Sequence, residues 1–205
     1  GIDTAEGGNN TAFCVGDKLG AMEMVGVKTR DTTIVCDLAR DLVRLHNVPT
    51  ERVVFDIGGG GKEHSDRLRR DFGWKCQAVT FSGKTPIDLK RGLTRIEDRQ
   101  AHREVKAIYA SRRVEMYCDA STIMNPATGG YGVPSERNGG PWARLAKYLK
   151  PLQRTYDEDG VMWLPKKEDL SKDFYNGESP DEADAFVLMV RGLTHKGLRS
   201  KAGAA

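Results

Sequence analysis

Several features that mark common protein classes are absent from the sequence. No apolar run is long enough to span a bilayer, so we expect no membrane association. The four cysteines form no Cys-x-x-Cys pair and the four histidines are scattered, which indicates neither a zinc centre nor a disulfide framework. We therefore expect reduced and mostly buried thiols, as in a cytosolic protein.

An excess of charge of one sign is also absent. The 205 residues include 32 Lys or Arg and 29 Asp or Glu, which gives a formal net charge of +3. This balance excludes a strongly basic coat for nucleic acid, although it permits a basic face beside an acidic site. The length is that of one ordinary domain, which can bury a core without disulfides or metals.

A P-loop for binding nucleotide phosphates is missing as well. The glycines from Gly58 to Gly61 are followed by Lys62 and then Glu63, so no Ser or Thr follows the lysine. Asp56 also stands where the first glycine of that motif belongs. This stretch therefore does not belong to a P-loop ATPase.

What the sequence does contain is a strand–aspartate–glycine arrangement that occurs twice. The apolar run Val53–Phe55 leads into Asp56 and four glycines, and the chain opens with Ile2, Asp3 and a turn at Gly7–Gly8. A carboxylate at the end of a buried strand is either a hydrogen-bonded turn residue or a functional group on a rigid element. The repetition favours the functional interpretation.

The order of the expected elements indicates a mixed α/β sheet flanked by helices. An antiparallel meander of three strands precedes a helix, a strand, a helix and a strand, at residues 1–3, 11–17, 21–27, 32–46, 52–56, 62–72 and 75–81. Downstream we expect a helix, a Gly/Pro-rich surface loop, a short helix and a hairpin, at residues 103–117, 125–140, 142–149 and 152–164.

A third acidic element begins an apolar helix near the end of the chain. Ser179 is the expected N-cap and Pro180 the first helical residue. The helix dipole explains acidic residues in a first turn, which accounts for Asp181 and Glu182. Asp184 instead enters a helix made of core residues, and a buried carboxylate needs a partner such as a divalent cation.

The three acidic elements predict one metal site, made of Asp3, Asp56, and Asp181 with Asp184. Mg²⁺ and Mn²⁺ prefer carboxylate oxygens together with retained waters. Two such ions about 4 Å apart can activate water and stabilise the leaving oxygen of a phosphodiester. The pattern therefore predicts metal-dependent phosphodiester hydrolysis.

At these residues the chain resembles the nuclease domain of the large terminase subunit of tailed bacteriophages, a ribonuclease-H-like fold. The similar segments follow the family's order: Gly1–Asp3 with its glycine turn, Val53–Gly60, Arg113–Tyr117 and Ser179–Ala185. The third of these is similar to the family's Arg-Ala-Glu-Met-aromatic helix. The stretch 125–140 departs from the compact family pattern and is interpreted as an insertion.

The resemblance implies an endonuclease dependent on Mg²⁺ or Mn²⁺ that cuts concatemeric double-stranded viral DNA at the start and end of genome packaging. By position it makes Asp3, Asp56 and the pair Asp181 and Asp184 the catalytic metal ligands, with Asp184 the first choice of the pair. It places the protein in the host bacterial cytoplasm.

For the domain organisation, the resemblance implies a nuclease domain at 1–193 and a flexible basic tail at 194–205. Because the sequence begins at the first expected strand, we expect an N-terminal ATPase domain in a longer protein. The small terminase subunit and the portal are the other partners that the resemblance implies.

Two alternatives to a nuclease stay open from the residues alone. The two Asp-Gly loops also resemble the phosphate loops of actin-like and sugar-kinase-like ATPases, which share the sheet topology, although the chain is short for two such lobes. The second alternative is a catalytically inactive DNA-binding module. It does not explain why all four acidic positions of the predicted metal site are filled. For DNA contacts we predict the polar segment 82–99, with its phosphate-binding residues Lys84, Lys90, Arg91 and Arg95.

Overall fold

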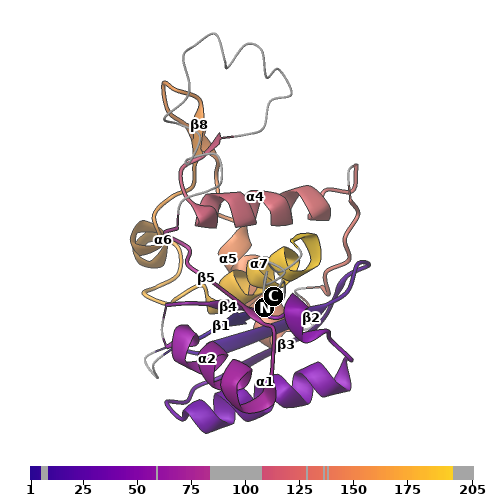
Figure 1. Cartoon of the computed structure of the whole chain (residues 1–205). Coiled ribbons are helices and arrows are strands. Elements are labelled where there is room, and N and C mark those ends of the chain that lie inside the picture. The colour runs from indigo at the N-terminus through magenta and orange to yellow at the C-terminus, as the bar shows by residue number, and fades with distance from the viewer. Residues whose placement is uncertain are drawn as a thin grey trace, which may run out of the picture.

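The centre of the fold is a five-stranded sheet with the strand order β3-β2-β1-β4-β5 (Figure 1). The computed structural model describes residues 1–5, 9–58, 60–83, 108–127, 129–135, 137 and 139–195. β1, β4 and β5 run parallel, whereas β2 is antiparallel to β1 and β3. The strands are β1 (Ile2–Asp3), β2 (Thr11–Gly16), β3 (Ala21–Val27), β4 (Val54–Asp56) and β5 (Gln77–Val79). This arrangement confirms the predicted meander followed by parallel strands.

One face of the sheet is covered by α1 (Thr32–Leu45) and α2 (Gly61–Phe72), which lie below it in Figure 1. α1 begins after Asp31, whose side chain accepts a hydrogen bond from the Thr33 amide at 2.7 Å. A short 3₁₀ helix, η1 (Thr50–Arg52), then leads into β4. Alternation along the strands directs apolar side chains into this layer, where they pack against Leu68 of α2; among them are Ile2, Phe13, Val15 and Phe55.

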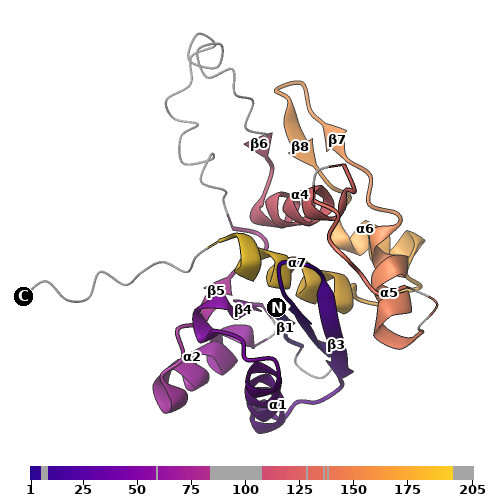
Figure 2. The same ribbon diagram turned by 90° about the vertical axis from the view of Figure 1, so that its right-hand side faces the viewer.

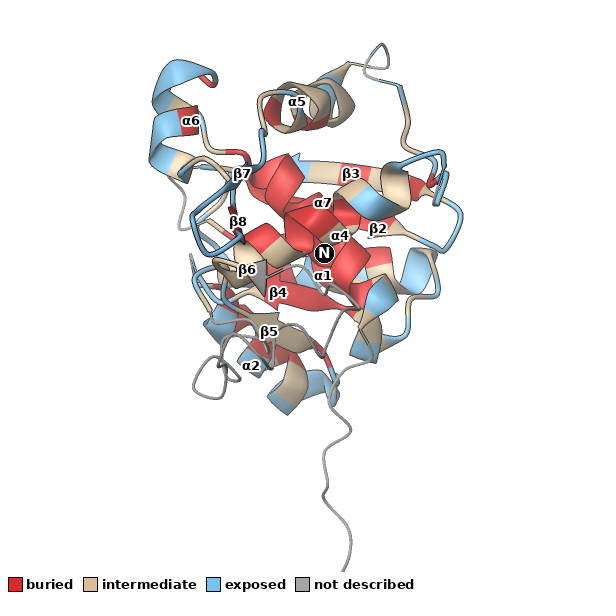
Figure 3. Ribbon diagram, turned by 90° about the horizontal axis from the view of Figure 1, so that it is seen from above, coloured by how far each residue is buried: buried red, intermediate tan, exposed pale blue. Residues whose placement is uncertain are grey.

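The opposite face is covered by α7 (Asp181–Thr194), with α4 (Arg112–Met124) across it and α5 (Gly140–Leu149) beside it (Figures 1 and 2). α7 is buried over nearly its whole length, as its colour in Figure 3 shows. The core on this face includes Ala12, Cys14, Val54, Met116, Phe186 and Leu188. Full burial of each large apolar side chain stabilises the fold by about 1.5–3 kcal/mol, which fixes α7 against the sheet.

Glycine is required where β4 ends. Gly60 has φ +80°, and a Cβ on Gly61 would lie 1.7 Å from the carbonyl oxygen of Asp56. The hydroxyl of Thr4, just after β1, donates to the carbonyl of Gly58 at 3.1 Å. The turn is therefore folded back onto β4 and tied to the end of β1.

A small second sheet stands apart from the main one. It has the order β6-β8-β7 and contains β6 (Ile108–Tyr109), β7 (Thr155–Tyr156) and β8 (Val161–Trp163). The hairpin of β7 and β8 projects from the body in Figure 2, which confirms the predicted hairpin. α6 (Lys167–Asp173) follows it and returns the chain to the main body.

Two predicted helix boundaries are wrong. The helix expected at 103–117 begins only at Arg112 and ends at Met124, and Ile108–Tyr109 are a strand. That strand pairs with β8 about fifty residues later, a partner that local periodicity cannot show. At α7, Pro180 is the N-cap and Asp181 the first helical residue, one position later than predicted.

The expectation of reduced and buried cysteines is confirmed, whereas the stretch expected as a surface loop at 125–140 contributes to the core. All four cysteines are free and buried, and burial raises the pKa of the Cys14 thiol to about 12. Gly132 forms a β-bridge with Gly20, just before β3, and the neighbouring Tyr131 lies in the core. None of the helices in the described parts of the chain is both long and apolar enough to cross a membrane.

Candidate metal and catalytic site

Strand register places Asp3 and Asp56 side by side at one edge of the sheet. Ile2 of β1 pairs in parallel with Phe55 of β4, so the next residue of each strand is an aspartate. Adjacent strands lie about 4.8 Å apart, and residues next to each other in sequence point to opposite faces. Because Ile2 and Phe55 face α1 and α2, both aspartates face α7. The predicted pair is therefore brought together.

The first turn of α7 adds Asp181 and Asp184 to the same edge. Asp181 accepts a hydrogen bond from the Asn10 amide at 3.0 Å, just before β2. Asp184 lies one turn further along and is buried. Glu182 turns to another side and pairs with Arg144 at 2.5 Å. Two of the three acids in this turn therefore join the strand aspartates.

The carboxylates at this edge act on one another. Burial raises the pKa of Asp3 well above its ordinary value, and the charges of Asp184, Asp181 and Asp56 raise it further. Burial also raises the pKa of Asp56, although the backbone amides of Gly58 and Ile57 oppose that shift. These effects show that all four predicted acids share one electrostatic environment.

Two further residues complete the site, and the sequence reasoning missed both. The hydroxyl of Tyr117, from α4, donates to Asp184 Oδ1 at 2.6 Å, and the ammonium of Lys167, from α6, donates to Asp184 Oδ2 at 2.8 Å. Arg113, one turn before Tyr117, donates to the carbonyl of Pro165 at 3.0 Å and so ties α4 to the chain leading into α6.

Lys167 is held at the site by charge. Burial alone would lower the pKa of Lys167, but the charges of Asp184 and Asp3 raise it above the ordinary value overall. The Lys167 side chain is 40% exposed, whereas that of Asp184 is 2% exposed. The ammonium therefore reaches from the surface to a buried carboxylate and compensates part of the negative charge.

The side chains at this edge offer the oxygen donors that hard divalent cations bind. Four carboxylates face one contacting ammonium, and carboxylate oxygens are what Mg²⁺ and Mn²⁺ prefer. Within the described residues, however, no three His, Cys, Asp or Glu side chains are spaced as a ready metal centre. Tyr117 donates to one oxygen of Asp184 and Lys167 to the other, so a metal ion would compete with the Lys167 ammonium for this carboxylate.

A second group of buried charges lies at the other end of α7. Arg191 of α7 faces Glu115 of α4, with 3.7 Å between Nη1 and Oε2, and neither of these atoms has a hydrogen-bond partner within the described chain. Asp119, one turn further along α4, has a pKa raised to about 6 by burial and by Glu115, with Arg191 opposing the shift. Here a base of α7 faces an acid of α4, which is typical of an ion pair that supports packing.

The predicted DNA-binding residues Lys84, Lys90, Arg91 and Arg95 lie outside the described residues. The tail from 196 onward lies outside them as well. Their roles therefore stay predictions.

Comparisons with known proteins give matches among solved structures. No family model matches the chain, and no curated protein matches it in sequence. The nuclease domain of the large terminase subunit gp2 of the bacterial virus Sf6 aligns with a TM-score of 0.67 and 16% identity, covering 92% of this chain and 85% of that one.

Two metal-bound structures of single-residue variants of that subunit are similar to a comparable degree. One, with manganese and β-thujaplicinol, has a TM-score of 0.67 and 18% identity, and covers 92% of this chain and 85% of that one. The other, with calcium, has a TM-score of 0.64 and 15% identity, and covers 92% and 86%. The comparisons give no support to the ATPase alternative. The chain therefore has the ribonuclease-H-like fold of a viral terminase nuclease domain.

Proposed function

We propose that this chain is a metal-dependent DNA endonuclease domain that hydrolyses phosphodiester bonds. The observation that carries the proposal is the convergence of Asp3, Asp56, Asp181 and Asp184 at one edge of a ribonuclease-H-like sheet, with more negative charge than Lys167 compensates. Uncompensated buried charge is costly, so a fold that keeps it has a use for it.

Asp3, Asp56 and Asp184 are the residues that would hold Mg²⁺ or Mn²⁺, and Asp181 lies beside them. The chemistry that two such ions supply at a site is activation of water and neutralisation of charge on the leaving oxygen. Tyr117 orients the Asp184 carboxylate through its hydroxyl. Lys167 neutralises part of the charge of the same carboxylate, and because its side chain is partly exposed it can withdraw toward solvent.

The structural likeness supports the finer proposal that the chain acts in viral genome packaging. The Sf6 structures are of a terminase nuclease domain, and some contain manganese or calcium. By analogy, the substrate here is concatemeric double-stranded DNA, and the expected partners are an ATPase domain, a small terminase subunit and a portal. At 15–18% identity this part of the proposal depends on the fold, so it needs its own test.

A plasmid cleavage assay tests the proposed activity. The purified chain is incubated with supercoiled DNA and Mn²⁺, Mg²⁺, Ca²⁺ or a chelator. We expect cutting with Mn²⁺ and Mg²⁺ alone, because the looser coordination of Ca²⁺ misplaces the attacking water. Asp56→Asn should abolish cutting, whereas Asp41→Asn, the same change on the exposed side of α1, should not.

Two outcomes contradict the proposal. Undiminished cutting in excess chelator would exclude a metal-dependent mechanism, and full activity in Asp56→Asn would remove the assigned site. ATP hydrolysis that is lost when the Gly58–Gly61 turn is altered would instead favour the actin-like alternative. We also expect the isolated domain to cut DNA without sequence preference, so fragments that all share one end sequence would contradict that expectation.

A further inference from the structure

Three exposed cations emerge at the same edge of the sheet as the candidate site. Thr11 at the start of β2 pairs with Val27 at the end of β3, and Ala12 pairs with Asp3. The chain that leaves β3 therefore emerges at the edge where Asp3 lies, and it carries Lys28 and Arg30 there.

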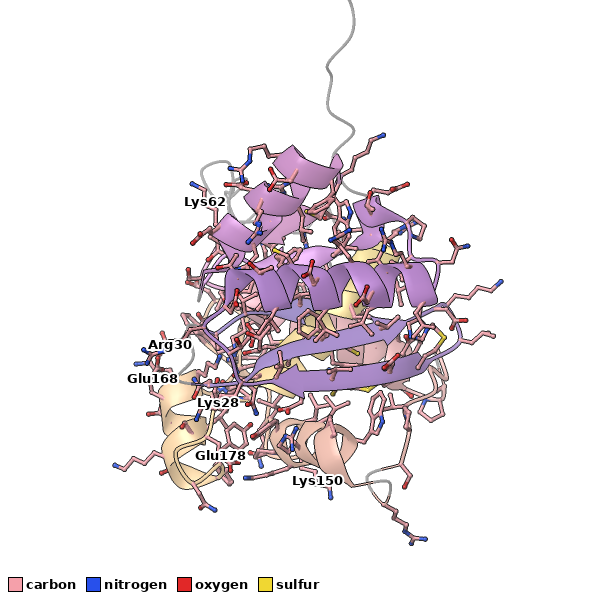
Figure 4. All side chains as sticks on the ribbon, turned by 90° about the horizontal axis from the view of Figure 1, so that it is seen from below. Lys28, Arg30, Lys62, Lys150, Glu168 and Glu178 are labelled. Atoms are coloured by element: carbon pink, nitrogen blue, oxygen red, sulfur yellow. The ribbon has the colours of Figure 1, made fainter. Side chains whose placement is uncertain are left out.

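The third cation approaches from the other side of the site. Lys62 lies in the first turn of α2, six residues after Asp56 and directly after the glycine turn that folds back on β4. Lys28, Arg30 and Lys62 are all exposed, and Figure 4 shows them projecting from the same side of the molecule. We call these three residues the basic rim.

The fold does not use the charges of the basic rim. Within the described part of the chain, none of the three side chains makes a hydrogen bond or an ion pair. Other arginines are paired with a nearby acid, as in the half-buried Arg40 with Asp37 and Arg69 with Asp66. The rim cations are therefore available to an external anion without the loss of an internal contact.

The placement of the rim suits a polyanion that extends past the site in both directions. β3 is two strands from β1, so its end lies about 10 Å to one side of Asp3, while Lys62 lies on the opposite side, beyond β4. Duplex DNA carries one phosphate per about 1.7 Å of helix axis. A duplex with one phosphodiester at the carboxylates therefore presents further phosphates to both sides of the rim.

We propose that Lys28, Arg30 and Lys62 bind backbone phosphates on either side of the scissile phosphodiester and hold the duplex across the carboxylates. This inference rests on the proposed nuclease function and assigns a substrate-positioning surface that is separate from the segment 82–99. Phosphate contacts carry no base information, so the rim fixes register and orientation without sequence preference. Glu168 lies on the same side of the molecule in Figure 4, and its negative charge would repel the phosphates that the rim binds.

The test compares two triple variants that remove the same charges. The rim variant is Lys28→Ala/Arg30→Ala/Lys62→Ala. The control, Lys18→Ala/Arg44→Ala/Lys75→Ala, also removes two lysines and one arginine from exposed positions, but at the β2–β3 turn, the end of α1 and the start of β5. Those positions lie toward the opposite edge of the sheet. Both proteins should keep the melting temperature of the parent.

The measurement is the salt dependence of binding to a short labelled duplex, followed by fluorescence anisotropy in chelator so that no DNA is cut. Each lost phosphate contact reduces the slope of log affinity against log salt by about 0.9, so the rim variant should lose up to about 2.7. The control should keep the parent slope. Glu168→Gln should strengthen binding, because it removes a repulsive charge.

The possible results of this experiment test the inference and the proposed function independently. Equal slopes for the rim and control variants would overturn the inference, even if the parent cuts DNA with Mn²⁺. Conversely, a parent that binds through the rim but does not cut with any metal would contradict the proposed function alone. A reduced slope in the rim variant only, together with slower cleavage at moderate salt, is the predicted result.

Discussion

The two ends of α7 carry buried charges that differ in balance. At its first turn, Asp181 and Asp184 meet the strand aspartates, and Lys167 is the ammonium that contacts them. At its last turns, Arg191 faces Glu115 of α4, with Asp119 beside it. Both groups lie between α7 and its neighbours, and α4 contributes to each, so packing alone does not distinguish them.

The two groups of charges are expected to affect stability in opposite directions. At the Arg191 end, removal of one partner leaves the other buried without compensation, a situation that costs the folded state about 3–5 kcal/mol. At the Asp3 end the charges of the neighbouring acids already raise the pKa of Asp3, so removal of the Asp3 charge should stabilise the folded state. A charge whose removal stabilises the folded state is kept for function and not for stability.

The largest expected effect is on catalysis at the Asp3 end. Asp3→Asn should reduce cleavage by about 100-fold or more, because loss of a few kcal/mol of transition-state stabilisation corresponds to that factor. In chelator the same variant should melt at a higher temperature than the parent, since a buried and repelled charge is gone. Plasmid cleavage and thermal melting measure the two effects.

Glu115→Gln is the matched control at the other end of the helix. It also replaces a carboxylate by an amide of the same shape, but it should lower the melting temperature and leave cleavage within a few-fold of the parent. If Asp3→Asn and Glu115→Gln change the melting temperature in the same direction, the proposed difference between the two ends of α7 is wrong.

The next largest effect is on stability at the Arg191 end. Arg191→Met should lower the free energy of unfolding by about 3–5 kcal/mol, since Glu115 and Asp119 lose the cation that faces them. Urea denaturation measures this. The double variant Arg191→Met/Glu115→Gln should recover part of the loss, and no recovery would show that Arg191 acts through packing and not through charge.

A smaller effect is expected when Tyr117 loses its hydroxyl. Tyr117→Phe removes the hydrogen bond to Asp184, and loss of such an outer contact typically weakens metal binding by about 10–100-fold. Calorimetric titration with Mn²⁺ measures it. Tyr175→Phe is the control, because that hydroxyl donates to the backbone carbonyl of Tyr148, and its Mn²⁺ affinity should be that of the parent.

The smallest effect concerns pH. The pKa of Asp119 in the folded protein is raised from 3.8 to about 6, so the folded state holds that proton more tightly than the unfolded chain does. This contribution to stability is fully present below pH 3.8 and is lost as the pH rises through about 6. Asp119→Asn should therefore flatten the fall in melting temperature across that window, and an unchanged pH profile would contradict the assignment.

The parts of the site that the sequence predicted depend on local pattern. Asp3 and Asp56 follow short apolar runs and precede glycines, and this signal lies within a few residues of each aspartate. Asp184 stood out because it interrupts an apolar helix. In each case the chemistry that needs the carboxylate is visible in its immediate neighbours.

The parts that were missed depend on contacts between distant segments. Lys167 reaches Asp184 across 17 residues and Tyr117 reaches it across 67, and neither neighbourhood differs from an ordinary helix. Tyr117 did lie in the segment that resembles the terminase helix, which is the one signal that could have identified it. β6 was missed for the same reason, because its partner β8 lies far along the chain.

The proposed metal site is tested most directly by Mn²⁺ binding in the absence of DNA, monitored by electron paramagnetic resonance. We expect the parent and Glu115→Gln to bind Mn²⁺ with similar affinity, and the double variant Asp3→Asn/Asp56→Asn not to bind it. Equal binding by all three proteins would show that the carboxylate edge is not a metal site, and it would contradict the proposed function.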